Sequence, residues 1–123
     1  MKGRQLTCTV LLVFVALFSG CSPCENEIIA EVPSPDKSRT AAVMIRGCGA
    51  TTSDYTRVLV RPNSRMTPEI EQVVFVARYR QSIEVTWKTS LELVIKCPTC
   101  SKEETEFQSV KIGRLSVYYD LPP

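Results

Sequence analysis

Two cysteines with the spacing of a reactive pair lie near the end of the chain. Cys97 and Cys100 are separated by Pro98 and Thr99, and in thiol–disulfide oxidoreductases such a pair reacts because a helix N-terminus stabilises the first thiolate. Here residues 101–107 show no helical apolar periodicity, and the chain lacks the alternating strand–helix pattern of a thioredoxin domain. The pattern favours a structural disulfide, with thiol redox chemistry as the alternative function.

A polar loop that contains two glycines is the second group of residues with ligand chemistry. Residues 46–54 read Arg-Gly-Cys-Gly-Ala-Thr-Thr-Ser-Asp, in which Thr51, Thr52 and Asp54 offer oxygen ligands for an ion or a polar molecule. The competing interpretation is structural, because the glycines allow positive φ beside a disulfide and the hydroxyls bond loop backbone. We favour the structural interpretation and keep these three residues as a candidate polar-ligand loop.

The composition removes several enzyme classes. The chain has no histidine, so it lacks the usual proton shuttle at neutral pH and the commonest zinc ligand. Neither Asp54 nor any glutamate lies at a sequence spacing from a second acid or base that would indicate a catalytic pair. We therefore assign no catalytic residue, no metal site and no cofactor.

The N-terminal segment has the features of an export signal. Lys2 and Arg4 precede an apolar run over residues 6–18, whose length suits a signal core and is short of the roughly twenty residues that span a bilayer. The residues that follow, Ser-Gly-Cys at 19–21, resemble the lipobox of bacterial lipoproteins. That resemblance implies cleavage before Cys21 and its acylation with palmitate-type chains. The alternative is an ordinary secretory signal cut nearby, which leaves Cys21 free.

These features divide the chain into a signal peptide at 1–20, a lipidated linker at 21–27 and one β domain at 28–123. Ser22 stands where an aspartate would suggest inner-membrane retention, so the periplasmic face of the outer membrane is favoured in a Gram-negative cell. Without Lys2 and Arg4, the thirteen remaining basic residues balance the thirteen acidic ones. The neutral mature chain offers no basic field for nucleic acid.

Two disulfides are expected in an exported domain of this size. Cys24, Cys48, Cys97 and Cys100 remain after the signal cysteine and Cys21 are set aside, and three pairings are open to them. A local bond between Cys97 and Cys100 would leave Cys24 to pair with Cys48. Closing that longer loop should stabilise the fold by about 3 kcal/mol.

The elements that must position these residues read as strands. Period-two alternation marks segments at residues 28–32, 40–46, 57–61, 83–87, 91–95 and 115–119. The segments at 83–87 and 91–95 flank a polar turn at 88–90 and predict a hairpin with one buried face. The alternating residues of that face are Ile83, Val85, Trp87, Leu91, Leu93 and Ile95. Residues 67–70 look like a helix start, but the β-branched run that follows favours a short turn there and a strand at 72–79.

The pattern predicts an all-β fold, a small antiparallel β-sandwich or open barrel of six or seven strands. The Ser34-Pro35-Asp36 turn and the later Cys-Gly-Ala-Thr-Thr segment at 48–52 resemble small uncharacterised bacterial exported proteins and lipoproteins. That resemblance implies a compact β domain with no assigned activity. We expect a lipid-anchored envelope module that binds a protein or another envelope partner, rather than an enzyme. A thiol redox protein and a purely structural envelope component remain alternatives.

Overall fold

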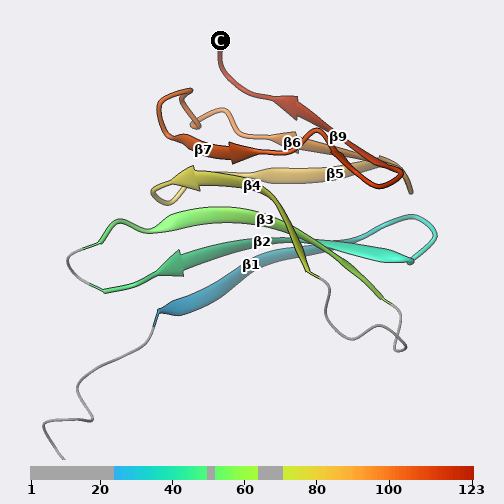
Figure 1. Ribbon diagram of the computed structural model, residues 1–123, viewed down its shortest axis with the longest axis horizontal. Coiled ribbons are helices and arrows are strands. Elements are labelled where there is room, and N and C mark those ends of the chain that lie inside the picture. The colour runs from blue at the N-terminus through green and yellow to red at the C-terminus, as the bar shows by residue number, and fades with distance from the viewer. Residues whose placement is uncertain (1–23, 50–51, 64–70) are drawn as a thin grey trace, which may run out of the picture.

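The computed structural model describes residues 24–49, 52–63 and 71–123 (Figure 1). These residues form nine strands and no helix, which confirms the all-β prediction. The strands are β1 Glu25–Pro33, β2 Arg39–Gly47, β3 Tyr55–Pro62, β4 Gln72–Arg78, β5 Glu84–Thr89, β6 Glu92–Lys96, β7 Thr105–Gln108, β8 Lys111–Ile112 and β9 Leu115–Asp120. β4 confirms the strand predicted at 72–79, whereas the turn predicted at 67–70, the signal segment and Cys21 lie outside the described residues.

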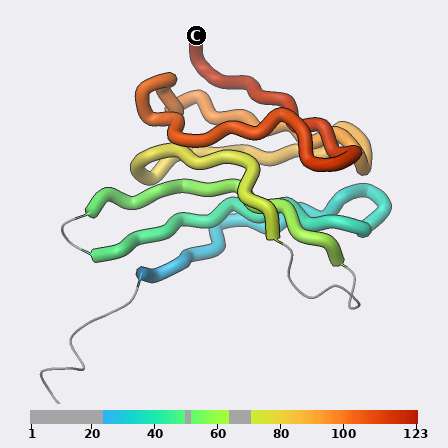
Figure 2. Tube along the Cα trace, viewed as in Figure 1, coloured from blue at the N-terminus to red at the C-terminus, as the bar shows by residue number. Residues whose placement is uncertain are grey.

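The strands form two sheets. One has the order β1-β2-β3-β4-β7 and the other the order β5-β6-β9-β8. In Figure 2 the chain runs from β1, in blue in the lower part of the view, to β9, in red in the upper part. The described chain exceeds the six or seven strands expected because β7 and β8 are short and carry little alternation. The expectation of a wholly antiparallel fold is also corrected, since β9 runs parallel to β6.

The parallel pair follows from the route of the chain. After β6 the chain crosses to the other sheet, where β7 pairs with β4, and returns through β8. β9 therefore arrives beside β6 in the same direction, as a parallel pair requires a long connection.

The core lies between the sheets and takes side chains from both. Its largest fully buried members include Phe75 from β4, Leu93 and Ile95 from β6, and Leu115 from β9. Alternation on β2 and β3 is as predicted, because the inward residues of both strands are buried: Ala41, Val43, Ile45, Val58 and Val60. Burial of these apolar side chains is the main favourable contribution to folding.

The predicted hairpin is present, with one change at its turn. β5 and β6 pair antiparallel, with Val85 opposite Ile95 and Trp87 opposite Leu93. Leu91, expected on the buried face, is 42% exposed because it lies in the turn that precedes β6.

β1 departs from its predicted boundary and alternation. It begins at Glu25, so residues 25–27 belong to the sheet rather than to the expected linker. A β-bulge lies between Ile28 and Ala30, which pair with Met44 and Val43 on opposite faces of β2. Because an extra residue reverses the alternation, Ile28 is exposed while Ala30 packs against the core.

Leu59 also differs from its expected environment. It lies on the face of β3 opposite the buried Val58 and Val60, where alternation along the strand predicts an exposed residue, yet it is buried. Its neighbours in the register are Ala42 on β2 and Val73 on β4. These residues form an apolar strip on the outer face of the five-stranded sheet, which alternation along one strand does not reveal.

Two aromatic side chains join the sheets. The Trp87 indole on β5 donates a hydrogen bond to the Val32 carbonyl on β1, with an N···O distance of 2.8 Å. The Tyr119 hydroxyl on β9 lies in hydrogen-bond range of the carbonyls of Val74 and Ser109. Burial raises the pKa of Tyr119 to about 12, so the hydroxyl keeps its proton and remains a donor at neutral pH.

Candidate functional site

A disulfide brings the start of β1 beside the polar loop. Cys24 is bonded to Cys48, one position beyond the register pair Glu25 and Gly47. This bond is the pairing expected from the sequence. It closes a chain separation of 24 residues and fixes the first residues of β1 against the end of β2.

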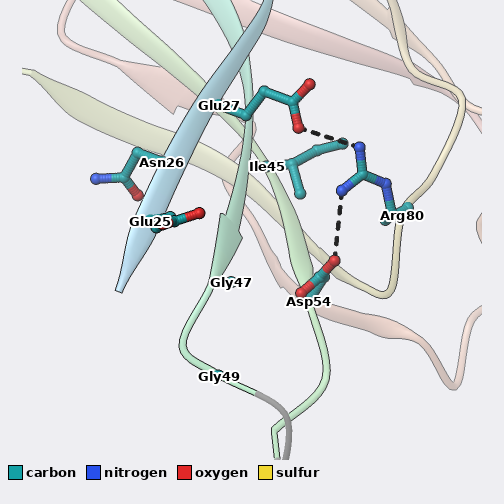
Figure 3. A pocket seen from close by; sticks show the side chains of 8 residues that line it. All are labelled: Glu25, Asn26, Glu27, Ile45, Gly47, Gly49, Asp54 and Arg80. Atoms are coloured by element: carbon teal, nitrogen blue, oxygen red, sulfur yellow. Dashed lines mark hydrogen bonds and ion pairs between the residues drawn. The ribbon is translucent and has the colours of Figure 1, made fainter. Parts of the chain in front are cut away.

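A pocket of about 530 Å³ lies next to this disulfide (Figure 3). Its walls come from the start of β1, the end of β2, the loop before β3 and the turn after β4. The lining residues are Glu25, Asn26, Glu27, Ile45, Gly47, Gly49, Asp54 and Arg80.

Arg80 joins two walls of the pocket. Its guanidinium lies 3.1 Å from a Glu27 carboxylate oxygen and 3.5 Å from an Asp54 carboxylate oxygen, and Figure 3 shows both carboxylates turned toward it. The bond to Glu27 is the main reason that the pKa of Arg80 is raised above its ordinary value. Arg80 is exposed and these pairs lie in solvent, so they order the side chains more than they stabilise the fold.

A strained turn presents Arg80. The preceding residue, Tyr79, has a φ of 69°, which a non-glycine residue adopts rarely. Its N–H donates to the Asp54 carbonyl at 2.6 Å, and its own carbonyl accepts the buried Thr56 hydroxyl at 2.7 Å. The Thr56 hydroxyl oxygen in turn accepts the Gln81 N–H. These bonds hold the turn against the start of β3 and so determine where Arg80 lies.

Gly47 leaves room for the Asp54 carboxylate in the pocket. A Cβ atom at this position would lie 2.8 Å from an oxygen of the Asp54 carboxylate, closer than real Cβ atoms approach. A glycine here therefore allows Asp54 to sit over β2 and to reach Arg80.

The pocket is acidic. Glu25, Glu27 and Asp54 contribute three carboxylates, whereas Arg80 contributes one guanidinium, so two negative charges are in excess. The ligand chemistry that fits is cationic. Within the described ranges, no group of three or more acidic, cysteine or histidine side chains could hold a metal ion.

The predicted polar-ligand loop is only partly in this pocket. Asp54 lines it, but Thr52 bonds the loop backbone, since its N–H and hydroxyl both approach the Gly49 carbonyl. Thr51 lies outside the described residues. Gly49 has a φ of 112°, in agreement with the structural interpretation of the loop.

Sequence reasoning missed Glu25, Glu27 and Arg80. Arg80 lies 26 residues from Asp54 and 53 from Glu27, and no local spacing links them. The signal that could have found the two glutamates is the expected Cys24–Cys48 bond, because it places the start of β1 beside the loop.

The Cys97–Cys100 pair forms the local disulfide that the sequence favoured. Both cysteines are buried, and the two residues between them form a turn after β6. The Cys97 N–H donates to the Asp120 carbonyl, and the Thr99 hydroxyl donates to Gln81. Since a thiolate must reach a sulfur atom to exchange with it, burial makes this bond a staple of the core.

No family model, curated protein or solved structure matches this chain. Among residues 24–49, 52–63 and 71–123, no helix has the length and apolar character needed to cross a membrane.

Proposed function

We propose that this protein is a lipid-anchored module of the bacterial envelope that binds a protein partner. The main support for this proposal is the order of the segments along the chain. A lipobox-like Ser-Gly-Cys at 19–21 follows an apolar signal-like run, and a sandwich stapled by two disulfides begins at once after it. Acylation of Cys21 would hold this domain at a membrane surface.

The disulfides support export. Stable disulfides form in oxidising compartments such as the periplasm and are rare in the cytosol. The Cys24–Cys48 bond lies three residues after Cys21 and would couple the anchor directly to the folded domain.

The exposed acidic pocket supports a binding role. Its one guanidinium, that of Arg80, is already paired with the carboxylates of Glu27 and Asp54. The pocket therefore has more carboxylates than cations, and these carboxylates face solvent. Such a site attracts a cationic group without supplying a nucleophile and a base in contact. The redox alternative is less well supported because both Cys97 and Cys100 are buried.

Substitution of Cys21 tests the anchoring. In cells that export the protein, the wild-type chain should fractionate with membranes, and intact mass should show an acylated Cys21 as the first residue. Cys21→Ala should yield either an uncleaved precursor or a soluble protein, because the acyl chains supply roughly 0.8 kcal/mol for each buried methylene.

The matched control is Ser22→Ala, which changes the next residue and leaves the acylated thiol in place. Its membrane fraction should equal that of the wild type. A soluble wild-type protein with a first residue other than Cys21 would contradict the proposal.

A further inference from the structure

One half of an edge strand is open beside the acidic pocket. β1 pairs with β2 in its sheet, and no described strand pairs with its other side. The end of β1 is covered, because Trp87 occupies the Val32 carbonyl and Pro33 has no N–H. Every residue of the first half, Glu25 to Ile29, is exposed. We call residues 25–29 the open edge.

The open edge carries apolar side chains where an edge strand is usually protected. Ile28 and Ile29 are 53% and 49% exposed. Edge strands that avoid pairing place charges, prolines or bulges along their length. The bulge at Ile28–Ala30 ends the regular part of the edge, yet it leaves two adjacent isoleucines in solvent, which favours contact with another molecule.

The charge of the open edge selects the partner. Glu25 and Glu27 lie on it, and they line the pocket with two negative charges in excess. A second copy of β1 would set these glutamates against one another, and like charges across strands are destabilising. A strand that carries lysine or arginine is complementary.

The position of the open edge limits where the partner can be. Cys24 is the third residue after Cys21, and a fully extended stretch of that length spans at most about 11 Å. Cys24 is the residue before the open edge, and its disulfide holds it on the domain. An acylated Cys21 would therefore keep the open edge close to the membrane surface.

We infer that the open edge docks an extended, basic segment of another envelope protein at the membrane surface, by addition of a strand to β1. This inference rests on the lipid anchoring proposed above. Backbone hydrogen bonds to the added strand supply affinity, and the isoleucines bury apolar surface against it. The carboxylates of Glu25, Glu27 and Asp54 receive a lysine or arginine of the segment.

Binding of two synthetic peptides tests the chemistry. The probes are capped nine-residue peptides, one alternating lysine with valine and the other glutamate with valine, titrated into the detergent-purified protein. The lysine peptide should bind at least tenfold more tightly, slow amide exchange within residues 25–29 and weaken as salt rises. Glu25→Gln should weaken binding several-fold, and Glu103→Gln, an exposed control outside the pocket, should leave it unchanged. Equal affinity for both peptides, or protection elsewhere, would overturn the inference.

Photo-crosslinking in intact cells tests the partner. A photoreactive residue at Ile29 should link the full-length protein to one envelope protein, through a segment that contains lysine or arginine. The same residue at Val110, which is 67% exposed and precedes β8, is the control for nonspecific capture. A crosslink from Ile29 to a second copy of this chain would refute the choice of partner. The absence of any crosslink from Ile29 would refute the docking of a partner at the open edge.

The same experiment separates this inference from the proposed function. A membrane-bound protein that links through Val110 but not through Ile29 would leave the binding module intact and refute the open edge. Protein found soluble, with Cys21 unmodified, would refute the anchoring itself.

Discussion

Asp36 holds the turn between β1 and β2. Its carboxylate accepts the Ser38 N–H at 3.0 Å and the hydroxyls of Ser38 and Ser34 at 2.7 and 2.8 Å. The Asp36 N–H donates to the Ser90 hydroxyl in the β5–β6 turn, which links the two sheets at this end. The donors, led by the Ser38 N–H, hold the pKa of Asp36 well below its usual range.

Asp36→Asn should therefore have a pH-dependent cost. A carboxylate whose pKa is lowered in the folded state contributes stability above its unfolded pKa of about 4, and that stability is lost as pH falls through the folded pKa. The free energy of unfolding should be larger for the wild type than for Asp36→Asn at pH 7, and the difference between the two should become smaller below about pH 4. Urea unfolding at several pH values measures it, and a gap that stays constant down to pH 2 would contradict this account.

Leu93 is the residue on which the hairpin packing can be tested. It is fully buried between the sheets, so Leu93→Ala should lower the free energy of unfolding by about 2–5 kcal/mol. Glu84→Ala, an exposed change on the paired strand, should stay within about 0.5 kcal/mol. Equal losses at the two positions in urea melts would show that the assigned faces are wrong.

At the scale of elements, alternation predicts strands but not their partners. The hairpin of β5 and β6 was predictable because both strands and their turn are local in sequence. The bulge in β1 could not be predicted, because Ile28, Ala30 and Val32 show unbroken alternation in the sequence. The parallel pairing of β9 with β6 could not be predicted either, because it depends on β7 joining the other sheet.

The same reason explains the site. Asp54 was identified because it belongs to a local run of polar residues, whereas Arg80 is presented by a left-handed turn at Tyr79 that no sequence pattern marks. The contacts of Thr56 that hold this turn join segments more than twenty residues apart.

The contact between β1 and β5 can be tested through Trp87. Trp87→Phe removes the donor to the Val32 carbonyl and should cost about 0.5–1.5 kcal/mol, with faster amide exchange at the end of β1. Tyr118→Phe, an exposed aromatic control on β9, should change the unfolding free energy by less than about 0.5 kcal/mol. Unaltered exchange in Trp87→Phe would mean that the indole bond does not close this side of the sandwich.

At the scale of the whole molecule, the two disulfides differ in access. Cys48 is exposed at the end of β2, whereas Cys97 and Cys100 are buried within the core. One bond fastens the margin of the domain beside the pocket, and the other lies inside it.

Reduction should therefore proceed in two steps. A mild thiol reductant under native conditions should expose Cys24 and Cys48 to alkylation first, and Cys97 and Cys100 should react only when urea opens the core. Mass spectrometry of the alkylated peptides measures the order. Simultaneous reaction of all four cysteines without denaturant would contradict the placement of the second bond.

The position of β9 also governs when the domain can fold. This last strand lies between β6 and β8 and supplies Leu115 and Val117 to the core. A chain delivered amino end first must hold β5 and β6 without their neighbour until residues 115–120 have been delivered, and such distant contacts form slowly. Assembly of the second sheet must therefore wait for delivery of β9, and a chain that stops before Leu115 leaves β6 without the strand on its far side.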